Sequence, residues 1–220
     1  MIDITYEVLE RNNLQDAYIR PLLICSPNMS LTKGKESDLL IAAWDWTSFL
    51  GTKPLRVTVS PFARPNPNAF NVRAKVGGHY VNSIMASQEA KDRGFDDALL
   101  LDNYRNVAEA PGANIFFEKD GVLYTPPTGN ILPGITRATV FELCEELNIK
   151  VVEKKFLPEE LKSADGAFYC GTAVEVLGLE SIDDVPFKKQ FDDTIGKQIQ
   201  TAYADLVREK MVIKSFAEAI

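Results

Sequence analysis

Apolar residues at the start of the chain form one helical pattern followed by two strand-like runs. Residues 2–12 carry apolar side chains at helical spacing and predict an amphipathic helix. Apolar stretches predict strands at residues 17–25 and 38–46, and the second is apolar enough to be buried on both faces. A helix and two strands bury little surface alone, so we expect residues 1–50 to be part of a larger domain.

The rest of the chain mixes strand-like and helical patterns. Residues 51–54, with glycine and proline, predict a linker, and residues 61–71 predict a loop rich in proline and asparagine. Strands are expected at residues 55–60, 97–102, 106–109, 113–118, 122–125, 149–152, 166–171 and 175–179. Helices are expected at residues 78–93, 136–147, 158–163 and 194–208. Hairpins mixed with separate helices predict an α+β fold, with residues 55–220 as one large domain.

Composition and charge exclude several classes of partner. The 220 residues are 45% apolar and 25% charged, as in ordinary globular proteins. A net charge of −7 argues against nucleic acid, which requires a basic face. The sequence has neither an apolar run long enough to span a bilayer nor a basic-then-apolar signal at its start, so no membrane partner is expected.

The cysteines predict reduced thiols rather than a metal centre. Cys25, Cys144 and Cys170 are widely spaced, and each has apolar neighbours. Such cysteines are typical of buried, reduced thiols in a cytoplasmic protein. No ligand spacing is present and His79 is the only histidine, so we expect no metal site.

The first candidate for chemistry is Lys75, within the run RAKVGGHY at residues 73–80. A small-residue bend follows the lysine at once, and Tyr80 comes five positions later. A lysine that is desolvated at a pocket becomes nucleophilic and can form a Schiff base with a carbonyl cofactor. The alternative is an ordinary charge at a turn or a helix start.

A single acid, Glu109, lies among small and apolar residues at the end of a predicted strand. A buried carboxylate needs a cationic partner, and a protonated pyridine nitrogen is one such partner. An ordinary loop carboxylate is the alternative.

Two further segments are suited to binding an anion. The run PGIT at residues 133–136 precedes a predicted helix, whose free N–H groups and threonine hydroxyl attract phosphate. The run GTA at residues 171–173 follows a predicted strand and offers a hydroxyl and main-chain N–H groups. A plain helix cap and a tight turn explain the same residues.

Taken in order, these motifs resemble the class IV pyridoxal-phosphate aminotransferases, and among them the branched-chain amino-acid aminotransferases. The resemblance covers essentially the whole chain, and the motifs that carry it are AYIRP at 17–21, KVGGHY at 75–80, EAPGANIF at 109–116, LPGITR at 132–137 and GTAVE at 171–175. It implies a fold of the D-amino-acid-aminotransferase type (fold type IV). In that fold a large C-terminal domain with a barrel-like mixed sheet and flanking helices follows a small α/β domain.

The resemblance also implies roles for individual residues. Lys75 would be the catalytic lysine, forming the Schiff base with pyridoxal 5′-phosphate and then moving a proton at the substrate. The other cofactor-binding residues would be Tyr80 at the phenolic oxygen, Glu109 at the pyridine nitrogen, Leu132 on the ring, and Ile135, Thr136 and Thr172 at the phosphate. The residues that face the substrate carboxylates would be Tyr18, Arg20, Thr172 and Ala173.

The activity implied is transfer of an amino group from leucine, isoleucine or valine to 2-oxoglutarate, by a homodimer or larger homo-oligomer. Family members carry a longer N-terminal portion, so we expect residues 1–50 to be only the last part of the small domain. That portion supplies an arginine to the phosphate and aromatic residues to the substrate pocket. Phe49 also stands where members often have a tyrosine. Two alternatives are a D-amino-acid transaminase or aminodeoxychorismate lyase, and an inactive fragment with a structural or interaction role.

Overall fold

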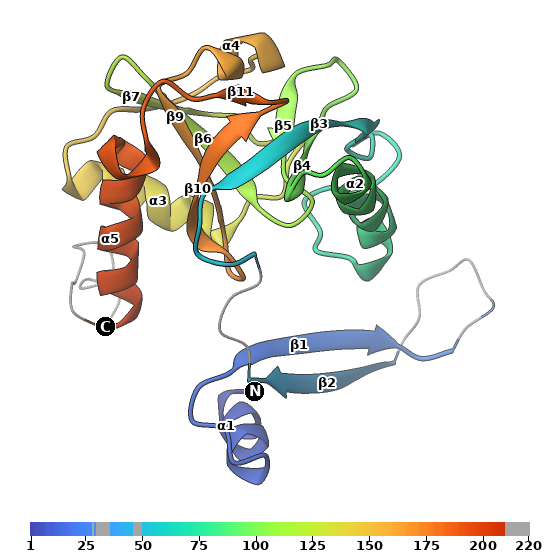
Figure 1. The fold of residues 1–220 in the computed structure, drawn as a ribbon. Coiled ribbons are helices and arrows are strands. Elements are labelled where there is room, and N and C mark those ends of the chain that lie inside the picture. The colour runs from blue at the N-terminus through green and yellow to red at the C-terminus, as the bar shows by residue number, and fades with distance from the viewer. Residues whose placement is uncertain (28, 30–35, 46–49, 210–220) are drawn as a thin grey trace. The chain divides into compact units, whose positions relative to one another are not determined.

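The computed structural model describes residues 1–27, 29, 36–45 and 50–209, and the chain divides into two compact units (Figure 1). The first unit is Met1–Phe49 and the second is Leu50–Ile220. The assignment of residues 1–50 to a small domain, 51–54 to a linker and 55–220 to a cofactor-binding domain stays a prediction.

In its described residues, the first unit consists of one helix and a two-stranded sheet. Its elements are α1 Ile2–Arg11, β1 Tyr18–Cys25 and β2 Ser37–Trp44, and the two strands pair in antiparallel fashion. No residue of α1 is buried. The expectation that the second strand is buried on both faces is wrong: β2 is exposed or half-buried throughout. Among the described residues of this unit, β2 has one strand neighbour and one helix to cover it.

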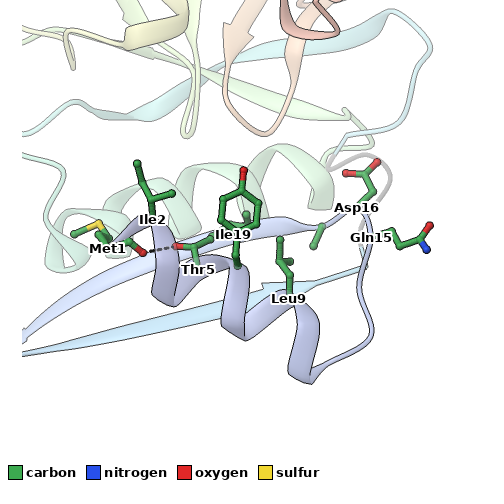
Figure 2. A pocket seen from close by; sticks show the side chains of 9 residues that line it. Met1, Ile2, Thr5, Leu9, Gln15, Asp16 and Ile19 are labelled. Atoms are coloured by element: carbon green, nitrogen blue, oxygen red, sulfur yellow. Dashed lines mark hydrogen bonds between the residues drawn. The ribbon is translucent and has the colours of Figure 1, made fainter.

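A shallow groove of about 440 Å³ lies between α1 and the start of β1 (Figure 2). It is lined by Met1, Ile2, Thr5, Tyr6, Leu9, Gln15, Asp16, Ala17 and Ile19. The amphipathic pattern that predicts α1 thus places apolar side chains against β1 without enclosing them.

The second unit is built on one mixed, half-barrel sheet. Its strands are β3 Leu55–Ala63, β4 Asp97–Leu101, β5 Val107–Glu109, β6 Asn114–Lys119, β7 Val122–Thr125, β8 Val151–Glu153, β9 Gly166–Gly171, β10 Glu175–Ile182 and β11 Val185–Pro186. The spatial order is β5-β4-β3-β10-β9-β6-β7-β8, and β11 pairs with β10. The pairs β10–β3, β3–β4 and β7–β8 are parallel, and the other pairs are antiparallel.

Alternation along the strands divides the core between the two faces of this sheet. On β9, Tyr169 belongs to one hydrophobic cluster, whereas Phe168 and Cys170 belong to another. On β4, Leu99 joins the first cluster and Leu100 packs with Ala86 and Ala90 in a third cluster. Successive side chains of a strand point to opposite faces, so one face gathers the first cluster and the opposite face packs against the helices at residues 80–92, 135–146 and 195–207.

The helices of the second unit lie where the sequence predicts them, with small shifts at their ends. They are α2 Tyr80–Asp92, preceded by a 3-10 turn at Gly77–His79, α3 Ile135–Glu146, α4 Pro158–Lys162 and α5 Ile195–Val207, preceded by a 3-10 turn at Phe191–Asp193. α2 packs on β3 and β4, while α3 and α5 pack near β9 and β10 (Figure 1). Among the described residues, none of the helices combines the length and apolarity that crossing a bilayer requires.

Two strands are longer than predicted. β3 continues to Ala63, into the segment predicted as a loop, and β10 continues to Ile182 and folds back into β11. The extra residues of β10 become strand because Ser181 and Ile182 pair with Arg56 and Val57 of β3. Pairing between distant segments is not visible in local sequence pattern.

Candidate active site

Lys75 lies in the bend between the loop after β3 and the start of α2. Its Nζ donates a hydrogen bond to the Tyr80 hydroxyl at 2.9 Å. The bend is held by the backbone, because Val76 N–H donates to the Ala74 carbonyl at 3.0 Å and His79 N–H donates to the Val76 carbonyl at 3.2 Å. Tyr80 is the first residue of α2, so the start of that helix positions the phenol beside the amine.

The expectation of a desolvated lysine is wrong for this structure. The Lys75 side chain is exposed, and Tyr80 is half-buried. Among the described residues, Tyr80 is the hydrogen-bond partner of the Lys75 amine, and it leaves the amine open to solvent. Desolvation of the Lys75 amine would require another protein segment or a bound ligand to cover it.

Glu109, the last residue of β5, is 4% exposed and surrounded by fixed donors. Leu132 N–H lies 3.1 and 3.2 Å from its two carboxylate oxygens. Asn114 Nδ2 donates to Oε2 at 2.9 Å. Arg64 Nε lies 2.7 Å from Oε1, as an ion pair without the alignment of a hydrogen bond. The carboxylate is therefore held in one orientation from three sides.

Burial dominates the protonation of this carboxyl group. Desolvation raises the pKa of Glu109 to about 7, against the lowering effects of Arg64, the Leu132 N–H and Lys75. Lys75 is therefore close enough to act electrostatically on Glu109. A cation bound against Glu109 would lower its pKa again, since an opposite charge favours the ionised form. The site thus fits the protonated ring nitrogen of a pyridine cofactor.

Arg64 and Asn114 belong to the candidate site, although the sequence alone does not single them out. Arg64 follows β3 in the proline- and asparagine-rich stretch, and its side chain is 8% exposed. Asn114 begins β6, and its Nδ2 also donates to the Leu132 carbonyl at 3.0 Å. The sequence does give a signal for both, because Arg64 lies in the proline- and asparagine-rich stretch at residues 61–71 and Asn114 lies within the EAPGANIF motif.

The N-terminus of α3 is open to an anion. Gly134 is the N-cap residue, with extended backbone and no side-chain cap. A Cβ on Gly134 would lie 2.3 Å from Asn114 Oδ1, so the close approach of these segments requires glycine. Thr136 in the first turn is 5% exposed. Uncapped N–H groups and a hydroxyl at a helix N-terminus fit a phosphate group.

The turn between β9 and β10 lies beside the EAPGANIF motif, which contains Glu109 and Asn114. Val174 N–H donates to the Gly171 carbonyl at 3.2 Å and closes the turn, and Thr172 is exposed within it. A Cβ on Gly171 would lie 3.3 Å from the Gly112 carbonyl oxygen. The pairing of Asn114 with Cys170 brings β6 and β9 together, so Thr172 comes near the segment that follows Glu109.

Comparison with known proteins identifies the family to which this arrangement belongs. The sequence profile described as Amino-transferase class IV matches residues 2–182. The chain belongs to the class IV aminotransferases. The sequence is 40% identical over 212 residues to a branched-chain-amino-acid aminotransferase of Pseudomonas aeruginosa, and the match covers 94% of this chain and 69% of that protein.

Solved class IV aminotransferases have the same fold. The branched-chain aminotransferase of Thermoproteus uzoniensis with norvaline is 36% identical, with a TM-score of 0.89, over 94% of this chain and 70% of that one. The enzyme of Thermobaculum terrenum in its PLP form is 31% identical, with a TM-score of 0.88, over 95% of this chain and 70% of that one. The predicted family and the predicted fold type IV are confirmed.

Within this class IV aminotransferase, the first unit contains two residues expected at the substrate. Tyr18 begins β1, where it pairs with Trp44, and Arg20 follows two positions later on the same face. Their contact with substrate stays a prediction, as do the roles of the cofactor-binding residues in the second unit. Phe49 lies outside the described residues.

Proposed function

We propose that this chain transfers an amino group from leucine, isoleucine or valine to 2-oxoglutarate, with pyridoxal 5′-phosphate as cofactor. The observation that carries the proposal is the Lys75 amine, 2.9 Å from the Tyr80 hydroxyl and within electrostatic reach of the buried Glu109. The names of the Pseudomonas aeruginosa and Thermoproteus uzoniensis proteins support the substrate class, and the PLP form of the Thermobaculum terrenum enzyme supports the cofactor.

Lys75 is the catalytic residue in this proposal. When bound, the cofactor supplies an electrophilic carbonyl carbon and a ring that accepts the electron pair left when the substrate Cα loses a proton. Lys75 would bind that carbonyl carbon, and, once released by the substrate amine, its free amine would move a proton at Cα. Tyr80 would hold both the amine and the phenolic oxygen of the cofactor.

Glu109 would hold the proton on the ring nitrogen. Its orientation comes from Asn114 and the Leu132 N–H, and Arg64 supports its ionised form. The Leu132 side chain would pack on the ring. Because the structure already holds Glu109 between these donors, little reorganisation would be needed when the ring binds.

The remaining residues would bind phosphate and substrate. The N–H of Ile135 and the side chains of Thr136 and Thr172 would donate to the phosphate, since its oxygens accept hydrogen bonds. The residues that would face the substrate carboxylates are Tyr18, Arg20, Thr172 and Ala173.

Turnover of defined amino acids tests the substrate class. With cofactor and 2-oxoglutarate, the chain should form glutamate from L-leucine and leave D-alanine unchanged, as followed by a coupled glutamate assay. Preference for D-alanine would replace this proposal with a D-amino-acid transaminase. Cofactor binding without turnover of either amino acid would favour the inactive fragment.

We infer that the chain forms a homodimer through a face that includes α2. Val81, Ile84 and Met85 are 63%, 65% and 46% exposed, and their spacing places them on one side of the helix. Exposed apolar side chains grouped in this way are typical of an interaction surface. Ile84→Glu should shift the sedimentation coefficient toward the monomer, whereas Lys91→Glu on the same helix should not. A wild-type protein that sediments as a monomer would contradict the inference.

We infer a cytoplasmic location for this enzyme. Cys144 and Cys170 are buried and unpaired, and Cys25 is also a free thiol. Free thiols are typical of a reducing compartment.

A further inference from the structure

The loop at residues 126–134, between β7 and α3, carries a residue on which the orientation of Glu109 depends. Leu132 of this loop has its N–H 3.1 and 3.2 Å from the two carboxylate oxygens of Glu109. Its carbonyl accepts a hydrogen bond from Asn114 Nδ2 at 3.0 Å. In the proposed function the Leu132 side chain also packs on the cofactor ring. The path of this loop therefore affects both Glu109 and the cofactor.

A side-chain hydrogen bond anchors the same loop two residues before Leu132. Asn130 donates from Nδ2 to Asp102 Oδ2 at 3.1 Å. Asp102 follows β4 and is 4% exposed. The N–H groups of Tyr104 and Asn106 donate to its other oxygen at 2.8 and 2.9 Å. The carboxylate is thus fixed by the turn after β4, and it ties the loop to that turn.

Packing alone restrains this part of the loop weakly. A cavity of about 250 Å³ is lined by the loop and by the turn after β4, with Asn130 and Asp102 among the lining residues. Atoms that line a void have no packing partners on that side. Gly129 has a φ of 125°, which favours glycine, so its backbone has more freedom than that of other residues. The hydrogen bond between Asn130 and Asp102 is therefore needed to hold the loop in place.

We propose that Asn130 is a positioning residue for Glu109 and acts through the Leu132 N–H. The inference rests on the proposed function, in which Glu109 holds the proton on the ring nitrogen. The bond to Asp102 fixes the loop, and the fixed loop keeps the Leu132 N–H directed at the carboxylate. A hydrogen bond donated to a carboxylate favours its charged form. Asn130 thereby supports the ionised Glu109 that a protonated ring nitrogen needs.

The charges around Glu109 allow this effect to be measured separately. Burial raises its pKa to about 7, and the Leu132 N–H lowers it together with three cations, which are Arg64, Lys75 and Arg137. Asparagine is neutral, so replacement of Asn130 leaves these three charges in place. A change in the pKa of Glu109 after such a replacement then reports on the Leu132 N–H.

Asn130→Ala removes the donor to Asp102 and keeps the net charge. In the cofactor-free protein, we expect the pKa of Glu109 to rise by about half a unit to one unit, as for the weakening of one hydrogen bond. Carboxyl ¹³C NMR of protein labelled at glutamate measures this pKa, and the Glu109 signal is assigned by its loss in Glu109→Gln. Asn103→Ala is the matched control, because Asn103 is an exposed asparagine in the same turn as Asp102. The control should leave the pKa unchanged.

The amide proton of Leu132 tests the route of the effect. An N–H that donates to a carboxyl group forms a stronger hydrogen bond when that group ionises. In the wild type, the Leu132 amide resonance should therefore move as Glu109 titrates, and in Asn130→Ala it should move less. A purely structural role would lower the free energy of unfolding without changing either NMR signal of the folded protein.

Three results would overturn the inference. The first is an equal pKa of Glu109 in the wild type and Asn130→Ala. The second is an equal rise of that pKa in Asn103→Ala, which would indicate a general disturbance of the turn. The third is a Leu132 amide resonance that moves as far in Asn130→Ala as in the wild type.

Turnover distinguishes failure of this inference from failure of the proposed function. With cofactor and L-leucine, Asn130→Ala should lower kcat about three- to tenfold and leave KM close to the wild type. If the wild type forms no absorbance band with pyridoxal 5′-phosphate while Asn130→Ala raises the pKa of Glu109, Asn130 still positions Glu109 and the proposed function fails. If the wild type turns over L-leucine while the pKa and kcat are the same in the variant, the proposed function stands and the inference fails.

Discussion

Lys75→Ala should reduce transamination by at least about 10²–10⁴-fold, because it removes the amine that would move a proton at the substrate Cα. The variant should also lose the absorbance band that the wild type forms with pyridoxal 5′-phosphate. Both results follow from the position of Lys75 Nζ, which lies beside the Tyr80 hydroxyl at 2.9 Å and acts electrostatically on Glu109. Steady-state kinetics at saturating cofactor and an absorbance titration measure the two effects.

Arg73→Ala provides the control for this experiment. Arg73 lies two residues before Lys75 in the same exposed loop and carries the same charge. Its loss should leave both the absorbance band and the turnover close to the wild type. A Lys75→Ala protein that kept the band, or that turned over at the wild-type rate, would show that another amine binds the cofactor.

In the cofactor-free protein, Glu109→Gln should remove a fall in stability that the wild type shows between about pH 4.5 and 7. Desolvation raises the pKa of Glu109 from 4.5 to about 7 in the folded state. The folded protein therefore holds a proton in this range that the unfolded chain has released. The free energy of unfolding then decreases as pH rises through the range. The contribution of Glu109 is at most about 3 kcal/mol.

Urea unfolding at a series of pH values measures this contribution. The free energy of unfolding of the wild type minus that of Glu109→Gln should decrease as the pH rises, because only the wild type loses stability in this range. Glu146→Gln is the control, because Glu146 is an exposed carboxylate at the end of α3. Its curve should stay parallel to that of the wild type. If the free energy of unfolding of the wild type minus that of Glu109→Gln increased with pH, the lowering effect of Arg64 on the pKa of Glu109 would outweigh the raising effect of desolvation.

Much of the second unit could be predicted from local pattern. The turn at residues 119–121 between two apolar runs predicts the hairpin of β6 and β7, and the periodic pattern before Leu147 predicts α3. These elements follow from interactions between residues near one another in the chain. Strand ends set by pairing with distant segments could not be predicted this way, as β10 and β11 illustrate.

The candidate site could be predicted in part for the same reason. Residues within recognisable motifs, such as Lys75 and Glu109, were proposed from sequence. Arg64 was not, because it contacts a residue far away in the chain. Arg64 follows β3 and reaches Glu109 at the end of β5, with β4 between the two strands. Local composition does not reveal this contact.

The sequence by itself determined the family, the order of most elements and the chemical groups available at the site. Apolar periodicity, turn residues and sequence motifs each depend on residues that are near one another in the chain. Only the tertiary structure decided the environment of those groups. It buried Glu109 among Arg64, Asn114 and Leu132, and left Lys75 exposed. Burial and electrostatics depend on which distant segments pack together, and that packing sets how strongly each group holds its proton.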